Sequence, residues 1–285
     1  MKPPSEVLRV IRLAAILALL LAFPSSGAEP KWKLVWSDEF NGPANSVPAQ
    51  SDWNFIKGWG PKGNHEIQWY CEPDNDAGPC DRKNPNLYED GEGHLVLNAI
   101  HNGQRWSSAR LDTQKKHTIL YGRVEARLRM EPGAGFWPAF WLLGDDIETA
   151  HWPNCGEMDI MEWVQKYGPG TTSSTIHGPG YSGGAGIDRT FPFPSGGRID
   201  DGQFHTYGVT WSKDRMEFYR DDPARPFFVV TPANLPAGKK WVFDHPFYVI
   251  LNFAVGEAGF PGTVDQTTPP TGKMWVDYVR FYQQQ

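Results

Sequence analysis

Short segments in which hydrophobic and polar residues alternate recur along the chain, with turn residues between them and almost no helical periodicity. Such alternation is typical of strands that bury one face, because successive side chains of a strand point to opposite sides. The predicted strands lie at residues 94–99, 122–130, 205–211, 215–220, 247–253 and 274–282. So many antiparallel strands in one domain predict an all-β fold, a jelly-roll sandwich of two antiparallel sheets.

The connections between these segments carry further information. Lys213 and Asp214 are predicted to turn a hairpin between two neighbouring strands. Residues 178–197 are rich in glycine and proline, and we expect a long loop over one face of the sandwich there. The chain contains no internal repeat and no long low-complexity linker, which favours a single domain.

The first 28 residues have the features of a secretory signal peptide. A basic start precedes an apolar segment at residues 13–23, and small residues at 26–28 offer a cleavage site. The apolar segment is short for a membrane span, which argues against an anchor. We therefore predict a signal peptide over residues 1–28, a catalytic-size domain over residues 29–285, and either a secreted or a periplasmic destination.

The charge of the chain limits its partners. The formal net charge of −6 becomes −8 when residues 1–28 are removed, because they hold three basic residues and one acidic residue. An acidic protein has no basic surface for nucleic acid or for an anionic membrane. The composition therefore suits a neutral polymer as the substrate.

The three cysteines are unevenly placed. Cys71 and Cys80 bracket a polar loop, and in an oxidising compartment they are predicted to form a local disulfide. Cys155 is left over as a buried thiol, and no paired base in the sequence suggests that it is a nucleophile. The cysteines also lack the ligand spacing of a zinc site.

The segment at residues 156–163 carries three acids in an otherwise apolar stretch, namely Glu157, Asp159 and Glu162. A half-buried strand rarely contains carboxylates unless chemistry requires them. Glu157 and Asp159 share one face of such a strand, whereas Glu162 falls on the other face by strict counting. One β-bulge near residues 160–161 would bring all three carboxylates to the same face.

With that bulge, the spacing of the two glutamates fits a known chemistry. Glu157 and Glu162 are then roughly 13 Å apart between Cα atoms, which leaves a carboxyl separation of roughly 5 to 6 Å. This separation is close to that of retaining glycosidases, in which one carboxylate attacks and the other moves the proton. Asp159 would position the nucleophile and keep the two glutamates electrically distinct. An acidic surface strand or a cation site is the open alternative.

An aromatic segment at residues 136–142 precedes the acidic strand. Alternation places Trp137 and Trp141 on one face and Phe136 and Phe140 on the other, so that one aromatic face faces the core and the second is available for binding. Aromatic rings stack on sugar faces while polar side chains bind the hydroxyl groups. An ordinary core role for any one tryptophan remains open. The candidate polar groups are Asn64, Glu66, Gln68, Arg110 and His177.

Several segments, taken in their order along the chain, resemble a known family. They are residues 36–42, 63–66, 108–111, 121–123, 137–142, 157–162, 177–182 and 276–280. Together they are similar to glycoside hydrolase family 16, on its laminarinase-type branch of endo-β-1,3-glucanases. The resemblance covers nearly the whole chain after residue 28.

The resemblance implies a jelly-roll with a substrate cleft across its concave face and retention of the anomeric configuration. Glu157 then matches the nucleophile, Glu162 the acid/base and Asp159 the assisting carboxylate. The extra Met161 matches the bulged variant of laminarinase-like members. The segment that begins at His177 points toward β-1,3-glucans.

The resemblance also implies a structural calcium ion on the convex face. Glu39, Gly93 and Asp277 occupy the matching positions, the first two through main-chain oxygens. Asp277 is equally explained as an acid at the end of a strand. One departure concerns residues 256–262, which replace the Trp-Pro-Gly turn common in relatives and are predicted to alter the edge of a sugar subsite.

These observations predict an exported, endo-acting hydrolase of internal β-1,3 linkages that works as a monomer without an organic cofactor. The candidate stacking platforms are Trp137, Trp141 and Trp152, and the candidate hydroxyl-binding residues are Asn64, Arg110 and His177. The same fold could act on mixed-linkage glucan or an algal galactan, or transfer sugar to sugar. A non-catalytic glucan-binding protein is a further alternative, although such proteins are expected to lose one or both glutamates.

Overall fold

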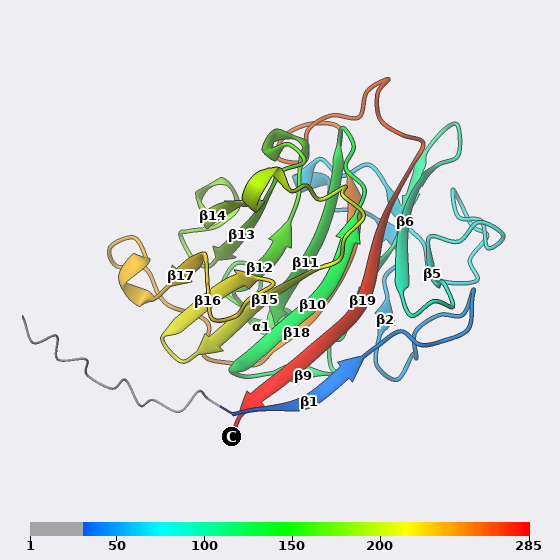
Figure 1. Cartoon of the computed structure of the whole chain (residues 1–285). Coiled ribbons are helices and arrows are strands. Elements are labelled where there is room, and N and C mark those ends of the chain that lie inside the picture. Colours follow the sequence, from blue (N-terminus) through cyan, green and yellow to red (C-terminus); the bar gives the residue numbers. More distant parts are fainter. Residues whose placement is uncertain (1–30) are drawn as a thin grey trace, which may run out of the picture. The chain divides into compact units, whose positions relative to one another are not determined.

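The computed structural model describes residues 31–285, and the predicted signal peptide lies outside the described residues. Two β-sheets, stacked face to face, form the framework of the described chain (Figure 1). This confirms the predicted all-β jelly-roll sandwich. In residues 31–285 the helices are too short and too polar to cross a membrane.

Eleven strands form the first sheet, which we call the back sheet. They are β1 (Trp32–Asp38), β3 (Gly58–Trp59), β4 (Trp69–Tyr70), β5 (Leu87–Glu89), β6 (Leu95–His101), β7 (Trp106–Ser108), β10 (Gly122–Met130), β15 (His205–Ser212), β16 (Arg215–Arg220), β17 (Phe228–Val230) and β19 (Thr271–Gln284). Their order is β17-β16-β15-β10-β19-β6-β7-β4-β3, with β1 on β19 and β5 on β6. All pairs are antiparallel except β4 with β7.

Eight strands form the second sheet, which we call the cleft sheet. They are β2 (Asn54–Phe55), β8 (Arg110–Asp112), β9 (Thr118–Ile119), β11 (Phe136–Gly144), β12 (Glu157–Glu162), β13 (Thr171–His177), β14 (Ile187–Pro192) and β18 (Phe247–Val255). Their order is β14-β13-β12-β11-β18-β8-β2, with β9 on β18. The short helices are α1 (Ile147–Ala150) and the 3-10 turns Lys62–Asn64, Gln165–Tyr167, Gly183–Ala185, Pro194–Gly196 and Pro232–Asn234.

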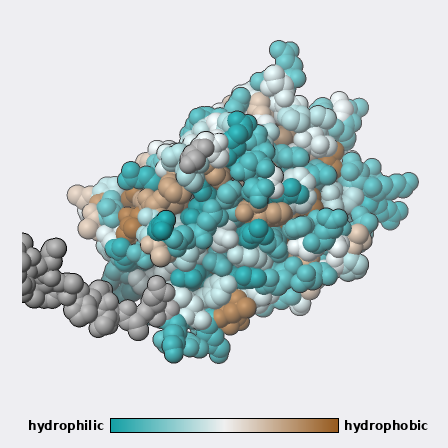
Figure 2. Space-filling model, viewed as in Figure 1, coloured by the Kyte–Doolittle hydropathy of each residue, from teal (hydrophilic) through white to brown (hydrophobic). Residues whose placement is uncertain are grey.

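The core lies between the two sheets and follows the alternation of the sequence. On β10, Val124, Ala126 and Leu128 are buried in the core, while the neighbouring arginines, Arg123, Arg127 and Arg129, are only partly buried. On β11, Phe136 and Phe140 enter the same core. On the face shown in Figure 2, hydrophobic residues form small separate patches among polar ones.

The predicted strands are all present, and β10 and β16 have the predicted bounds. The predicted long loop at residues 178–197 is wrong, because it contains β14, which pairs with β13. This strand is the edge of the cleft sheet, and most of its residues are exposed or half-exposed. An edge strand of this kind has no buried face, so it lacks the alternation that reveals a strand in a sequence.

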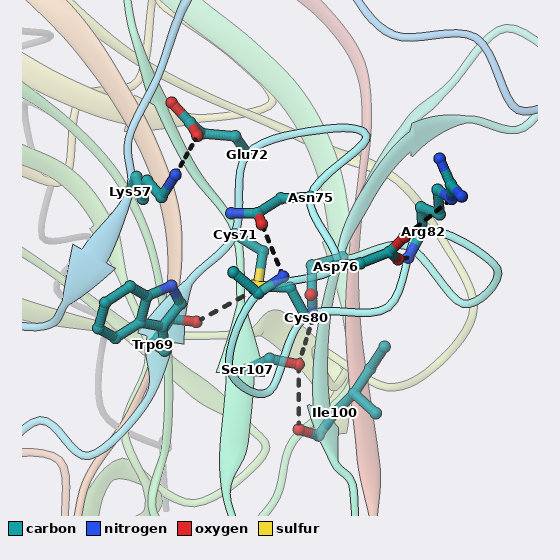
Figure 3. Close-up of a disulfide and its surroundings, with 12 residues drawn as sticks. Lys57, Trp69, Cys71, Glu72, Asn75, Asp76, Cys80, Arg82, Ile100 and Ser107 are labelled. Atoms are coloured by element: carbon teal, nitrogen blue, oxygen red, sulfur yellow. Dashed lines mark hydrogen bonds and ion pairs between the residues drawn. A yellow bond between two sulfur atoms is a disulfide. The ribbon is translucent and has the colours of Figure 1, made fainter.

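A disulfide joins Cys71 and Cys80, the pair that the sequence predicted, with their Cα atoms 5.8 Å apart. Figure 3 shows it closing the loop between β4 and β5, beside the ion pair of Lys57 with Glu72. Cys155 is the free and buried cysteine. Burial raises the pKa of the Cys155 thiol to about 12, so this group stays protonated and unreactive at neutral pH.

Candidate active site

The predicted bulge lies in β12. Across the pairing with β11, Asp159 lies opposite Trp141 and Met161 lies opposite Phe140, so that Ile160 is the extra residue. Ile160 and Met161 both pack in the core. The carboxylates of β12 therefore all face away from the core, into a groove on the outer side of the cleft sheet.

The groove has a volume of about 690 Å³ and crosses the strands rather than following one of them. Each of β8, β18, β11, β12, β13 and β14 contributes at least one side chain to its lining. Six strands at a spacing of about 4.8 Å span about 24 Å, which is enough for several sugar rings. The site residues predicted from the sequence that line this groove are Asn64, Arg110, Trp137, Trp141, Trp152, Glu157, Asp159, Glu162 and His177.

The three acids lie at the floor of the groove, where Asp159 and Glu162 are buried and Glu157 is half-buried. Asp159 is 4% exposed and Glu162 is 6% exposed. The Nε2 atom of His177 lies 3.2 Å from Oδ2 of Asp159 and 3.7 Å from Oε1 of Glu157. No lysine or arginine in the described part of the chain lies within ion-pair distance of these three carboxylates. The site thus concentrates three acidic groups that no lysine or arginine of the described residues contacts directly.

Burial governs the protonation of the three acids. The pKa of Glu157 is well above its usual range because of burial and because of the neighbouring charge of Asp159. The pKa of Asp159 is also well above its usual range, through burial and the charge of Glu162. Burial raises the pKa of Glu162 too. Carboxyl groups with raised pKa values are suited to general acid/base catalysis.

Indole N–H groups hold the two glutamates. Nε1 of Trp137 donates to Oε1 of Glu162 at 2.8 Å, and Nε1 of Trp152 donates to Oε2 of Glu157 at 2.8 Å. The third tryptophan of the groove, Trp141, donates instead to Asn252, at 2.7 Å. The structure therefore gives each predicted stacking platform a hydrogen bond in addition to its ring face.

A second polar group lies in the groove, around Glu66. Its Oε2 accepts hydrogen bonds from Gln68 at 2.6 Å and from the Tyr70 hydroxyl at 3.0 Å, and its Oε1 accepts one from Asn64 at 3.2 Å. The Asn252 amide in turn donates to the Tyr70 hydroxyl at 3.4 Å. This network presents fixed acceptors and donors to a ligand with several hydroxyl groups.

Sequence reasoning missed Asn252, although a signal for it exists. The residue is an amide within the nine-residue buried strand β18. As with the acids of β12, a polar side chain in a buried apolar run indicates a functional role. The guanidinium of Arg110 lies over the ring of Trp141, 4.9 Å from its centroid, so the two predicted binding residues form one unit. Arg110 also lies opposite Asn252 in the sheet.

The residues that form the groove wall beside Trp137 were also not predicted from the sequence. Phe260 contacts the edge of Trp137 with ring centroids 5.1 Å apart, and the ammonium group of Lys166 lies 4.2 Å from the Phe260 ring centroid. Tyr167 completes this wall. Phe260 belongs to the segment that departs from the Trp-Pro-Gly turn, so the departure lies in the groove wall, where a subsite edge was predicted.

The predicted calcium positions come together through strand pairing. β1 and β6 pair with β19 on either side of Asp277, which brings Glu39 and Gly93 near it. The carboxylate of Glu39 is bonded to Arg280, and that of Asp277 is bonded to Arg127. Because Glu39 is predicted to bind through its main-chain oxygen, its bond to Arg280 does not affect the predicted site, whereas Asp277 is engaged by Arg127. The calcium site stays a prediction.

Three groove residues meet the spacing of a metal-ligand set. The ligand atoms of Glu157, Asp159 and His177 lie within 4.8 Å of one another. Two carboxylates and one imidazole could hold a divalent transition-metal ion. The same three groups are also suited to acid/base and nucleophilic chemistry on a glycosidic bond, which requires no metal ion.

An open groove with paired carboxylates on its floor and aromatic walls defines, together with this sandwich, an enzyme that hydrolyses O-glycosyl bonds. Residues 78–280 match the family model described as Glycosyl hydrolases family 16. The chain belongs to this family.

Known proteins of the family are similar over most of the chain. A beta-glucanase of Rhodothermus marinus is 34% identical over 95% of this chain and 94% of its own length. The catalytic domain of an endo-1,3-beta-glucanase (laminarinase) from Thermotoga petrophila RKU-1 is 36% identical, with a TM-score of 0.79 over 90% of this chain and 99% of that chain. An endo-beta-1,3-glucanase from Pyrococcus furiosus is 39% identical, with a TM-score of 0.78 over 90% and 96%. Two further relatives are longer proteins, of which the chain spans 39% and 34%.

Proposed function

We propose that the protein is an exported, retaining endo-β-1,3-glucanase that cleaves internal linkages of β-glucans. The observation that carries this proposal is the bulged strand β12, which turns Glu157, Asp159 and Glu162 together into a groove that is open to a polymer. The similarity to laminarinases supports the β-1,3 linkage.

The proposed reaction is a double displacement. Glu162 donates its proton to the leaving glycosidic oxygen while a carboxylate oxygen of Glu157 attacks the anomeric carbon, so that a glycosyl ester forms as the bond to the leaving sugar breaks. Glu162, now ionised, takes a proton from water, and the resulting hydroxide displaces Glu157 with net retention. Both steps use only side chains of this chain and water, so an organic cofactor is not required.

Asp159 acts as the assisting carboxylate in this scheme. It is the most buried of the three acids and lies between the other two on the same face of β12. Its raised pKa favours its protonated form, which limits the negative charge beside Glu157. A protonated Asp159 therefore favours the ionised, nucleophilic form of Glu157.

The walls of the groove supply the binding sites for the sugar rings. Trp137, Trp141 and Trp152 offer ring faces for stacking, and Trp152 is 46% exposed. Asn64, Arg110 and His177 line the same groove with polar groups for the hydroxyls. Because the groove crosses six strands, we infer that it takes several sugars on both sides of the acids, as an endo-acting enzyme requires.

Export is part of the proposal. The predicted signal peptide at residues 1–28 and the disulfide between Cys71 and Cys80 both suit an oxidising compartment. We further propose a monomer, and a calcium ion near Glu39, Gly93 and Asp277 that would have to draw Asp277 away from Arg127.

Release of reducing sugars by the protein lacking residues 1–28 tests the function. Laminarin, lichenan and agarose are compared, with Glu157→Gln as the control. We expect laminarin to be cut into several oligomer sizes by the unsubstituted protein alone. Activity confined to lichenan or agarose would replace the substrate while keeping the mechanism. A folded protein that binds glucan without cutting it would refute the enzymatic proposal.

A further inference from the structure

Each of the two glutamates accepts a hydrogen bond from one tryptophan, and in each case only one carboxyl oxygen takes part. Trp137 donates to Oε1 of Glu162, and Trp152 donates to Oε2 of Glu157, both at 2.8 Å. The two indoles come from different elements, β11 and the segment between α1 and β12. In the described residues, no lysine or arginine lies within ion-pair distance of either glutamate. The indole N–H groups are therefore the donors that distinguish the two oxygens of each carboxyl group.

The bond from Trp137 distinguishes the two oxygens of Glu162. In a protonated carboxyl group, the carbonyl oxygen is the better acceptor and the hydroxyl oxygen carries the proton. Since Oε1 accepts the indole N–H, the proton is placed on Oε2, which has a long contact of 3.5 Å with the Thr175 hydroxyl. The Phe260 ring packs against the ring of Trp137 and helps to fix it.

The bond from Trp152 distinguishes the two oxygens of Glu157 in the same way. Oε2 accepts the indole N–H, which leaves Oε1, on the side of His177, as the less engaged oxygen. The Trp152 ring is 46% exposed, so this donor is the more easily displaced of the two. The arrangement holds the acid/base firmly and the nucleophile more loosely.

We propose that Trp137 and Trp152 are positioning residues that select the reacting oxygens, so that Glu162 delivers its proton from Oε2 and Glu157 attacks through Oε1. This inference rests on the proposed function, in which these glutamates are acid/base and nucleophile. It assigns to the two tryptophans a task separate from sugar stacking, because the task depends on the N–H group and not on the ring face.

The two hydrogen bonds also act on protonation. A donor to a carboxylate favours its ionised form, so each indole opposes the rise in pKa that burial causes at its glutamate. Removing the donor from Glu162 raises the pKa of the acid and moves the basic limb of the pH profile to higher pH. Removing the donor from Glu157 raises the pKa of the nucleophile and moves the acidic limb to higher pH.

Phenylalanine substitutions separate the N–H group from the ring. We expect Trp137→Phe to move the basic limb of kcat/KM on laminarin, and Trp152→Phe the acidic limb, each upward by about half to one pH unit. Trp141→Phe is the matched control, because Trp141 lines the same groove but donates to Asn252. It should raise KM and leave both limbs in place.

A measurement without substrate separates this inference from the proposed function. Carbon-13 NMR of protein labelled at the glutamate side-chain carboxyls follows the titration of Glu157 and Glu162, assigned by Glu→Gln variants of each. We expect each phenylalanine variant to raise the titration of its own glutamate. Unchanged titrations in Trp137→Phe and Trp152→Phe would overturn the inference even for an active enzyme. If Trp137→Phe fails to fold, the exposed Trp152 decides the outcome by itself.

Discussion

Glu39, directly after β1 of the back sheet, accepts two hydrogen bonds from Arg280, at 2.9 and 2.7 Å, whereas Glu157 on the cleft sheet accepts one from the indole of Trp152 and lies near His177 and Asp159. The arginine lowers the pKa of Glu39, while burial raises the pKa of Glu157 well above its usual range. The same side-chain type is thus stabilised as an anion on one sheet and destabilised as an anion on the other.

Other acids of the back sheet resemble Glu39 in that hydrogen-bond donors hold their carboxylates. Asp277 is bonded to Arg127, and Glu125 accepts hydrogen bonds from the hydroxyls of Tyr219 at 2.6 Å and Tyr282 at 3.1 Å. The back sheet therefore uses its charged groups for stability. The cleft sheet keeps its carboxyl groups short of counter-charge, which costs stability and leaves them able to exchange protons.

The largest expected difference between the two sheets is in catalysis. Glu157→Gln should lower kcat on laminarin by more than about 10⁴-fold, because it removes the nucleophile. Glu162→Gln should lower kcat by about 10²–10⁴-fold, because it removes the acid/base. Glu39→Gln, the matched change on the back sheet, should leave kcat within about twofold. Equal losses in all three variants would contradict the division of roles between the sheets.

The next effect concerns the loop that the disulfide closes beside the back sheet. Replacing Cys71 and Cys80 with serine should lower the free energy of unfolding by about 2 to 3 kcal/mol, since the bond closes a short loop in the unfolded chain. Activity at 25 °C should persist, because neither cysteine lines the groove. Urea denaturation and laminarin assays on the double variant measure both quantities, and a loss of activity in a folded variant would argue against this separation.

A smaller effect, opposite in sign, is expected from the cleft acids. The pKa of Glu157 is higher in the folded than in the unfolded protein, so ionising this group lowers the free energy of unfolding. This loss is absent at or below the unfolded pKa, about 4.3, and grows as pH rises toward the folded value. Glu157→Gln should therefore raise Tm at pH 7 by about 2 to 4 °C, a gain that disappears near pH 4. Thermal melts from pH 4 to 8 measure this. A Glu157→Gln variant with a lower Tm than the unsubstituted protein at pH 7 would show that neighbouring groups stabilise the ionised Glu157.

The smallest expected effect is a loss of stability when Glu39 on the back sheet is replaced. The folded pKa of Glu39 is lowered by Arg280, so its contribution is present above the unfolded pKa and is lost as pH falls through the folded value. Glu39→Gln should lower the free energy of unfolding at pH 7 by about 1 kcal/mol or less, since the pair is partly exposed. The same melting series should show this loss shrinking toward pH 3, and a loss that grows there would contradict the assignment.

Much of the catalytic strand could be predicted from the sequence because its pattern is local. Three acids in an apolar run, with one residue too many for strict alternation, predict the bulge that the pairing of Trp141 and Phe140 with β12 confirms. The two faces of β11 were predictable for the same reason, since Phe136 and Phe140 enter the core and Trp137 faces the groove.

Features that depend on distant segments could not be predicted in this way. The hydrogen bonds of Trp137 and Trp152 depend on how strands and loops meet in space, which local alternation does not report. Phe260 reaches the groove from a loop whose sequence indicates only a departure from relatives. β14 was mistaken for a loop because it borders the sheet and buries little of its surface.

The position of β19 has a consequence for how the protein is made. This strand is the last in sequence, yet it lies inside the back sheet, between β10 on one side and β6 and β1 on the other (Figure 1). A nascent chain that has not yet released residues 271–284 from the ribosome leaves β1 unpaired and leaves one edge of β10 and one edge of β6 open, and open edges invite aggregation. Its contacts join residues far apart in sequence, so the back sheet is expected to form slowly and only after residues 271–284 have been made.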